Sequence, residues 1–431
     1  MVVTELRPYQ LRAVEWTEDT LPTLARPSVV VQAPTGAGKT VLMAALRPDV
    51  VIAPGVDLCA QLSSRVEGAT VLTTQLAALM LRRGEDLPPA RRVALDEARW
   101  VAAPGWGAIV DHYLQQGAEL ILFDATPTTT SGGGLGRWAD ALYQVATVRE
   151  LVDAGYLVPW KVMAPDEPQR ELAAEPVDAW HWQTPGESAI VFAENKAHAA
   201  GVVESFTRAD VSAALITDDT SERQRAWILR ALGDGSLTVA VCAQILRQGI
   251  DVPRVSSIIL ARACGSIPLY LQAVGRGGRP FEGKARCTVL DLRGTSRDPH
   301  IGHPEDPRIW ALDGPAVSLP ADLPACVMCE QCRAWGRGGR CQICGHALPP
   351  PGSPKVRAKD LIEVRAQTDG EEARRATLER FVQDAVRKGH KPWSAAHRYR
   401  GTYGAEPPRE WMVDILRWLQ QGPAQRTLLD I

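Results

Sequence analysis

Short apolar runs alternate with helix-favouring stretches along the first third of this chain. The runs, each rich in aliphatic residues, span Ser28 to Val31, Val50 to Ala53, Arg92 to Leu95 and Glu119 to Phe123. Strands that are separated by helical segments usually lie parallel and are buried on both faces. The pattern therefore predicts an α/β domain in which helices cover a parallel sheet.

The same rhythm restarts farther along the chain and predicts a second α/β domain. Its strands are expected at Ala189 to Phe192, Ala213 to Ile216, Leu237 to Cys242, Ser257 to Leu260 and Cys287 to Leu290. Gly155 to Pro159 is expected to form the strand that enters this domain, which puts the junction near Val152. After Asp298 the pattern breaks into loops, and the linker Pro349 to Pro354 precedes a mainly helical segment.

The chain thus divides into four predicted parts, at residues 1–152, 153–300, 321–350 and 355–431. No apolar run approaches the roughly 20 residues of a membrane span, and the N-terminus lacks the features of a signal peptide. We therefore expect a cytoplasmic protein with no membrane contact. A net charge of −2 argues against a protein that coats nucleic acid by bulk charge, and leaves room for a local basic channel.

A candidate phosphate-binding loop follows the first strand. The segment Ala33-Pro34-Thr35-Gly36-Ala37-Gly38-Lys39-Thr40 lies between an apolar run and a helix-favouring stretch. Gly36 and Gly38 would let backbone N–H groups turn toward phosphates. Lys39 would reach the β and γ phosphates, and the Thr40 hydroxyl would bind Mg²⁺. A Gly-rich turn before an unrelated helix is the plainer alternative, but the order of strand, loop and helix favours a nucleotide site.

Asp96 and Glu97 follow the third apolar run. In nucleotide hydrolases, an acidic pair at a strand end provides one carboxylate for Mg²⁺ and one for the attacking water. Asp96 would serve the magnesium ion through its outer coordination shell, and Glu97 would be the general base. Taken alone, Ala90 to Trp100 also fits a solvated helix in which Arg92 pairs with Asp96. The position downstream of the phosphate loop favours the acidic pair.

A second arginine-bearing motif, Gln272 to Pro280, lies far downstream and contains Arg276 and Arg279. Planar guanidinium groups suit a phosphoryl group whose charge builds up in the transition state. A basic surface loop is the alternative interpretation.

Together these motifs give residues 5 to 350 a resemblance to superfamily 2 helicases of the DEAD/DEAH-box class. The chain most resembles the bacterial and phage ATP-dependent helicases that are related to type III restriction subunits. Leu6 to Gln10 is similar to the adenine-reading motif of that family, which implies that Arg7 and Gln10 bind the nucleotide.

Further segments resemble family motifs in the expected order: Ala53 to Gln61, Thr73 to Gln75, Asp124 to Pro127, Ile190 to Ala193 with Asn195 and His198, Gln248 to Pro253, and Gln272 to Pro280. The resemblance implies that the first two contact the nucleic-acid backbone and that Asp124 to Pro127 couples hydrolysis to domain movement. It also implies that Asp251 faces the ribose and that Arg276 and Arg279 are arginine fingers.

The resemblance implies two tandem RecA-like domains that bind ATP and Mg²⁺ in their shared cleft. We expect a nucleic-acid-dependent ATPase that works as a DNA helicase or translocase. The catalytic residues would be Lys39, Asp96, Glu97, Gln272, Arg276 and Arg279. The alternatives are an RNA helicase, a duplex translocase without strand separation, and a weakly hydrolytic, nucleotide-gated nucleic-acid-binding module. The sequence does not specify polarity, pathway, oligomeric state or protein partners.

Three positions depart from the family pattern. Arg99 ends the second motif, where His or Asp is usual, and Asp124 begins the third, where an apolar residue or Thr is common. Cys242 stands where Ser or Thr often contacts a phosphate. Because Gln272 carries an acceptor oxygen, we hypothesise a hydrogen bond from Arg99 to Gln272 that couples two motifs.

Five clustered cysteines suggest a structural zinc site. Cys329-x₂-Cys332 and, after eight intervening residues, Cys341-x₂-Cys344 have the spacing of four tetrahedral thiolate ligands. Cys326 could replace one of these ligands. Five unliganded surface cysteines are the alternative, and they would have no packing rationale. The other cysteines, Cys59, Cys242, Cys264 and Cys287, are expected to be buried.

The segment Ala385 to Tyr403 combines Lys and Arg with Trp and Tyr and contains no acidic residue. Cations with interleaved aromatic rings suit phosphates and stacked bases. A solvated basic helix with its aromatic residues packed inward fits the same pattern. His390 and His397 in this segment are expected at the surface.

Overall fold

The computed structural model describes residues 5–129, 133–169, 171–243, 251–298, 301–308, 310–313, 327–328, 335–336, 358–364 and 366, and isolated positions between 375 and 415. The chain forms two compact units, residues 1–366 and 367–431. Since the second unit is described at isolated positions, its mainly helical character stays a prediction.

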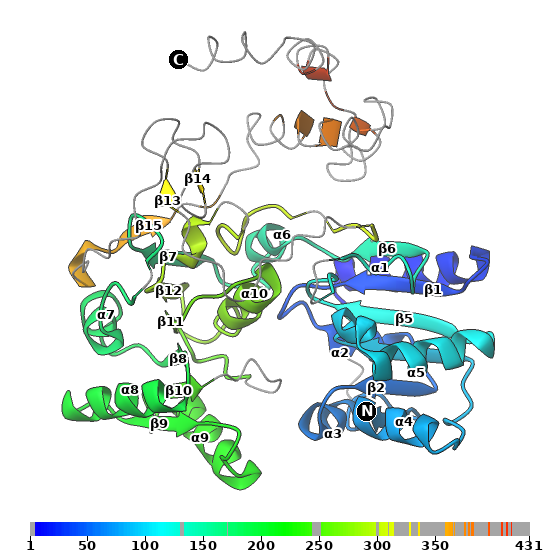
Figure 1. The fold of residues 1–431 in the computed structure, drawn as a ribbon, viewed down its shortest axis with the longest axis horizontal. Coiled ribbons are helices and arrows are strands. Elements are labelled where there is room, and N and C mark those ends of the chain that lie inside the picture. The colour runs from blue at the N-terminus through cyan, green and yellow to red at the C-terminus, as the bar shows by residue number, and fades with distance from the viewer. Residues whose placement is uncertain are drawn as a thin grey trace. The chain divides into compact units, whose positions relative to one another are not determined.

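The first sheet contains six parallel strands in the order β3-β2-β4-β5-β1-β6 (Figure 1). Its strands are β1 (Ser28–Gln32), β2 (Val50–Ala53), β3 (Thr70–Thr73), β4 (Arg92–Asp96), β5 (Glu119–Asp124) and β6 (Ala141–Gln144). The helices of this domain are α1 (Pro8–Thr20), α2 (Lys39–Ala45), α3 (Val56–Ser63), α4 (Thr74–Arg82) and α5 (Pro104–Gln115), with 3₁₀ turns η1 (Leu21–Thr23) and η2 (Ala98–Ala102).

The second sheet has the order β15-β7-β12-β11-β8-β10-β9. Its strands are β7 (Trp160–Ala164), β8 (Ala189–Ala193), β9 (Ala213–Ile216), β10 (Val239–Ala243), β11 (Ser257–Ala261), β12 (Cys287–Asp291) and the antiparallel β15 (Ile362–Val364). The accompanying helices are α6 (Val148–Asp153), α7 (Pro176–Gln183), α8 (Lys196–Arg208), α9 (Glu222–Asp234) and α10 (Ile267–Gly275), with 3₁₀ turns η3 (Thr295–Arg297) and η4 (Ala358–Asp360). A separate small hairpin pairs β13 (Val327–Met328) with β14 (Trp335–Gly336).

The buried strands explain why the apolar runs were informative. In β1, Val29 and Val31 pack into one hydrophobic cluster while Val30 packs into another. Neighbouring side chains of a strand point to opposite faces, so a strand that is covered on both sides needs an unbroken apolar run. All the runs that were predicted as strands between Ser28 and Leu290 form strands, apart from the domain-entry strand.

Three features of the sheets differ from the prediction. The entering strand begins at Trp160, not within Gly155 to Pro159, because Gly155 has a φ of +72° and the Val158 N–H donates to the Gly278 carbonyl outside the sheet. The short strands β3 and β6 were missed, since they are incompletely buried and lack a strong apolar signal. The strand β15 pairs with β7, so residues 362–364 of the predicted helical segment belong to the second sheet.

The scattered cysteines are buried. Cys59, Cys242, Cys264 and Cys287 are buried free thiols, as predicted, and burial raises the pKa of Cys242 to about 12.

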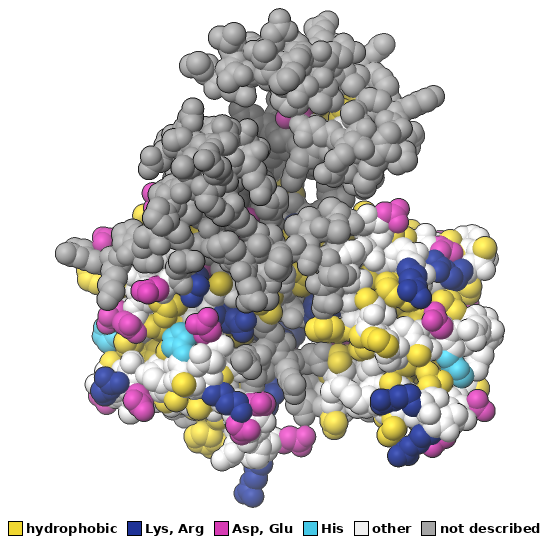
Figure 2. Space-filling model, in the orientation of Figure 1, with side chains coloured by type: hydrophobic (Ala, Val, Ile, Leu, Met, Phe, Trp, Pro, Cys, Tyr) yellow, Lys and Arg dark blue, Asp and Glu magenta, His cyan; other side chains and the backbone are white. Residues whose placement is uncertain are grey.

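On the face seen in Figure 2, Lys and Arg side chains are interspersed with Asp and Glu side chains over the described surface. Across the described residues, none of the helices has the length and apolarity needed to cross a membrane.

Candidate active site

Parallel strands bring the predicted chemistry to one edge of the first sheet. Gln32 pairs with Asp124 at the ends of β1 and β5, and Asp96 pairs with Phe123 at the end of β4. Since the carboxyl ends of parallel strands meet at the same edge, the loops that follow them form a common site.

The phosphate loop has the expected conformation between β1 and α2. Gly36 and Gly38 have φ angles of +89° and +86°, in the left-handed region that favours glycine. A Cβ at Gly36 would lie 2.7 Å from Leu157 Cδ2, and one at Gly38 would lie 2.5 Å from Gln10 Nε2. Both positions therefore require glycine for backbone shape and for space.

The start of α1 is bound to this loop. Gln10 is 3% exposed, its Nε2 donates to the Ala37 carbonyl at 3.0 Å, and its Oε1 accepts from the Arg7 N–H at 3.0 Å. The Tyr9 hydroxyl donates to the same Ala37 carbonyl at 3.0 Å. The Arg7 guanidinium lies 4.3 Å above the ring centre of Tyr156. The structure thus brings Gln10, a predicted adenine-reading residue, to the phosphate loop, while the Arg7 guanidinium lies against Tyr156.

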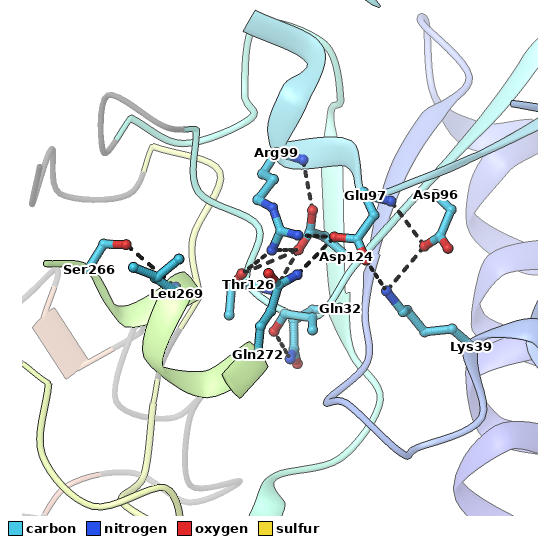
Figure 3. Close-up of polar contacts among 11 residues, drawn as sticks. Gln32, Lys39, Asp96, Glu97, Arg99, Asp124, Thr126, Ser266, Leu269 and Gln272 are labelled. Atoms are coloured by element: carbon cyan, nitrogen blue, oxygen red, sulfur yellow. Dashed lines mark hydrogen bonds and ion pairs between the residues drawn. The ribbon is translucent and has the colours of Figure 1, made fainter. Parts of the chain in front are cut away.

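The acidic pair stands at the end of β4 and faces the loop lysine (Figure 3). Lys39 Nζ lies 3.1 Å from Asp96 Oδ1 and 3.4 Å from Glu97 Oε1. The helical alternative for residues 90–100 is wrong. Arg92 is in a strand and pairs with Glu119 at 2.7 Å, so it is not the partner of Asp96.

Burial and charge act in opposite directions on these groups. Burial raises the pKa of Asp96, and the neighbouring Lys39 only partly offsets this effect. Burial alone would also raise the pKa of Glu97, but the charges of Lys39, Arg99 and Arg276 outweigh it and hold that pKa below its ordinary value. Glu97 is therefore ionised, as a general base must be before it accepts a proton.

Glu97 also receives donors from both domains. Arg99 Nη2 donates to Glu97 Oε2, and Gln272 Nε2, from α10 of the second domain, donates to the same oxygen at 3.2 Å. The predicted direct hydrogen bond from Arg99 to Gln272 is therefore replaced by a shared acceptor. Gln272 acts through its amide N–H and not through its acceptor oxygen, because the carboxylate is the stronger acceptor nearby.

The two unusual charges of this chain face each other. Asp124 is fully buried and accepts from the backbone N–H of Arg99 at 2.7 Å and from that of Thr126 at 2.8 Å. Arg99 Nη1 lies 3.6 Å from Asp124 Oδ1 and donates to Thr126 Oγ1 at 3.1 Å. Arg99 and Asp124 both depart from the residue types that are usual in the family, and they carry opposite charges. These two features together could have predicted that the residues pair. Each departure is visible in the sequence, but that the two side chains meet is visible only in the structure.

The end of α10 approaches the phosphate loop. A Cβ at Gly275 would lie 2.8 Å from Thr35 Cβ, and one at Gly36 would lie 3.9 Å from Arg279 Cγ. The Arg279 side chain forms an ion pair with Asp251. Both predicted arginines thus follow a helix that is in contact with the nucleotide-binding loop.

Two further motif segments begin helices at strand ends. Thr73 ends β3 and caps α4, with its Oγ1 accepting from the Leu76 N–H at 3.2 Å. Asn195 caps α8 in the same way, accepting from the His198 N–H at 2.9 Å. Helix N-termini are common contacts for phosphates. Cys242 is fully buried in β10, which leaves its thiol no open route to a phosphate.

Several predicted residues lie outside the described part of the chain. These are the zinc candidates Cys326, Cys329, Cys332, Cys341 and Cys344, the histidines His390 and His397, most of the basic segment 385–403, and residues 248–250 of the fifth motif. Among the described residues there is no group of three or more His, Cys, Asp or Glu side chains that could hold a metal ion. The zinc site stays a prediction.

The donor set beside Lys39 fits Mg²⁺. Magnesium prefers oxygen ligands and is usually held by one or two protein groups together with substrate phosphates. The Thr40 hydroxyl and the Asp96 carboxylate are such groups. The close approach of the Lys39 ammonium to Asp96 and Glu97 indicates that this acidic pair attracts a cation.

Parts of this chain are similar to known proteins. Residues 171–280 match the family model described as "Helicase conserved C-terminal domain". The chain is 22% identical over 262 residues to the ATP-dependent helicase IRC3 of Saccharomyces cerevisiae, a match that covers 54% of this chain and 38% of IRC3. Over about half of its length the chain thus resembles ATP-dependent helicases of superfamily 2.

Other relatives extend the comparison. A 101-residue stretch, 23% of this chain, is 37% identical to the pre-mRNA-splicing ATP-dependent RNA helicase PRP28 of Cryptococcus neoformans and covers 14% of it. The DNA-bound Type ISP restriction-modification enzyme LlaBIII superposes with a TM-score of 0.52 at 16% identity, over 67% of this chain and 27% of LlaBIII. This likeness shows a shared fold, with parallel sheets that resemble tandem RecA-like helicase domains. The chain spans well under half the length of these relatives.

Proposed function

We propose that this chain is a nucleic-acid-dependent ATPase that moves along or unwinds DNA. The observation that carries the proposal is the shared carboxylate of Glu97, which accepts hydrogen bonds from Arg99 of its own domain and from Gln272 of the second domain. A general base that both domains contact gives them a direct way to couple hydrolysis to domain movement.

Each residue has a separate task in this proposal. Lys39 contacts the β and γ phosphates, and Glu97 accepts a proton from the attacking water. When bound, Mg²⁺ would be held by Thr40 and Asp96 and would neutralise phosphate charge.

The remaining site residues bind the nucleotide or complete the site from the second domain. Arg7 and Gln10 read the adenine, and Gly36 and Gly38 shape the loop around the phosphates. Asp251 faces the ribose, and Arg276 and Arg279 stabilise the charge of the transition state.

The ion pairs of the site link nucleotide binding to closure of the cleft between the two domains. Lys39 pairs with Asp96 and Glu97, and Arg279 pairs with Asp251. Nucleotide phosphates would compete for both cations, which would release the carboxylates for their own roles. Hydrolysis then depends on both domains being in contact with the same nucleotide.

DNA is the polymer that we favour, and the likeness to the DNA-bound fold of LlaBIII is compatible with it. RNA is the second candidate, because the PRP28 stretch has the higher identity. A duplex translocase without strand separation is a third. A weakly hydrolytic, nucleotide-gated binding module would fit a Glu97 that stays paired with Arg99. We further propose the α/β domains at 1–152 and 153–300, the zinc module at 321–350 and, for the last predicted part at 355–431, helices only outside the strand at 362–364.

The test is steady-state ATPase activity without polymer and with single-stranded DNA, duplex DNA or RNA, together with a strand-displacement assay. We expect DNA to stimulate turnover and Glu97→Gln to abolish the stimulation, since it removes the base. Glu204→Gln is the matched control, because Glu204 is exposed on α8 and pairs with the exposed Arg208. A turnover that no polymer stimulates would sink the motor proposal, and stimulation by RNA alone would replace DNA with RNA.

A further inference from the structure

A half-buried lysine holds the backbone of two site segments together. Lys284 lies in the connection between α10 and β12. Its Nζ donates to the carbonyl oxygens of Pro253 at 2.9 Å, Val255 at 2.5 Å and Arg279 at 2.9 Å. An ammonium group has three protons and no acceptor, so three carbonyl partners use all of its donors.

These carbonyls belong to the two segments that carry Asp251 and Arg279. On one side the segments are joined by the ion pair between the Arg279 guanidinium and the Asp251 carboxylate, each about two-fifths exposed. On the other side they are joined by Lys284. The proposed function assigns Asp251 and Arg279 to the nucleotide. The amine of Lys284 therefore fixes the backbone of the two segments that carry these side chains.

We propose that Lys284 is a positioning residue that sets the backbone of the arginine-finger segment against the Asp251 segment. This inference rests on the proposed function, since it assigns Arg279 a task that Lys284 supports. Lys284 would act only through these backbone groups, because its amine is committed to their carbonyls. A planar guanidinium presents its donors in a fixed fork and would not reproduce this convergent geometry well.

The surroundings of the amine agree with a backbone role. Burial lowers the pKa of Lys284 to about 8, and the more distant Cys287 and Glu187 only partly oppose this effect. Arg254 and Arg286 line the same surface groove as Lys284. Among the described residues, the hydrogen-bond partners of the Lys284 ammonium are three backbone carbonyls and include no carboxylate. These carbonyls therefore stabilise its charge directly.

The test compares Lys284→Met and Lys284→Arg with Arg208→Met, a control on an exposed cation at the C-terminal end of α8. We expect Lys284→Met to lower polymer-stimulated kcat about 10- to 100-fold, as small displacements of catalytic groups do. The affinity for a fluorescent ADP analogue should change less than threefold, since the phosphate loop is intact. Lys284→Arg should recover only part of the rate, and Arg208→Met should retain the full rate.

A double variant separates positioning from general stability. If Lys284 acts through Arg279, Lys284→Met combined with Arg279→Ala should be no slower than Arg279→Ala alone. Multiplied losses in the double variant, or an unchanged kcat in Lys284→Met, would overturn the proposal.

Hydrogen exchange gives a readout that needs no turnover. Lys284→Met should raise amide exchange in residues 251–255 and around 279 while the first sheet keeps its protection. If the wild-type chain shows no ATPase activity, the proposed function fails but the backbone role is still decided by exchange. Unchanged exchange in these segments would overturn it.

Discussion

The buried pair of Arg99 and Asp124 gives the sharpest prediction, through the substitution Asp124→Asn. Asp124 is fully buried, and its two oxygens accept from two backbone N–H groups. In asparagine one oxygen becomes an NH₂ group, which leaves one N–H without an acceptor at a cost of about 1–3 kcal/mol. Removing one partner of a buried ion pair costs about 3–5 kcal/mol. Because Arg99 keeps Glu97 as a partner, we expect a destabilisation near the lower limit, about 3 kcal/mol.

Urea unfolding of the full chain measures this loss of stability. Asp111→Asn is the matched control, since Asp111 is exposed on α5 and should lose little stability. An Asp124→Asn chain whose unfolding midpoint equals that of the control would refute the ion-pair reasoning.

A double-mutant cycle tests whether the two charges act as a pair. Arg99→His and Asp124→Thr each introduce a residue type that is usual in the family, and each alone removes one charge of the buried pair. We expect each single variant to lose polymer-stimulated kcat, and the double variant to recover most of it, with a coupling of about 1–3 kcal/mol. Losses that simply add would contradict the pairing.

Three further predictions follow from contacts around the site. Gly275→Ala should lower polymer-stimulated ATPase activity, because its Cβ would lie 2.8 Å from Thr35 Cβ, whereas Gly201→Ala, which meets nothing within 4 Å, should leave the activity unchanged. Gln10→Ala should weaken ATP binding, measured by fluorescence titration, since Gln10 holds the Ala37 carbonyl of the loop; equal affinity would contradict this role. The wild-type kcat should fall above about pH 8, because the ammonium of Lys284 has a pKa of about 8 and loses one of its three donors there. In Lys284→Arg this alkaline decline should disappear.

The local parts of the site were predictable from the sequence for a physical reason. A phosphate loop needs a strand before it, a helix after it and glycines at left-handed positions, and all three are visible within a short segment. The acidic pair at the end of β4 followed from its place after a buried apolar run. The strand at 155–159 was misplaced because hydrophobicity alone does not reveal that Gly155 turns the chain before Trp160.

Contacts between distant segments were harder to predict. The donation from Gln272 to Glu97 joins two domains, and the residue types alone suggested Arg99 as the partner of Gln272. Lys284 gave no signal, since its partners are backbone carbonyls that every residue carries. Side-chain chemistry can be read from residue types, but the choice among several partners is made by tertiary packing.

The most direct test of the central claim is the polymer-stimulated ATPase rate of Arg279→Ala beside Glu97→Gln. The claim is that one nucleotide site is built from both domains. It predicts that each variant loses about 10³-fold or more in kcat while still binding a fluorescent nucleotide analogue. A wild-type rate in Arg279→Ala would contradict it, because the second domain would then contribute nothing to the chemistry.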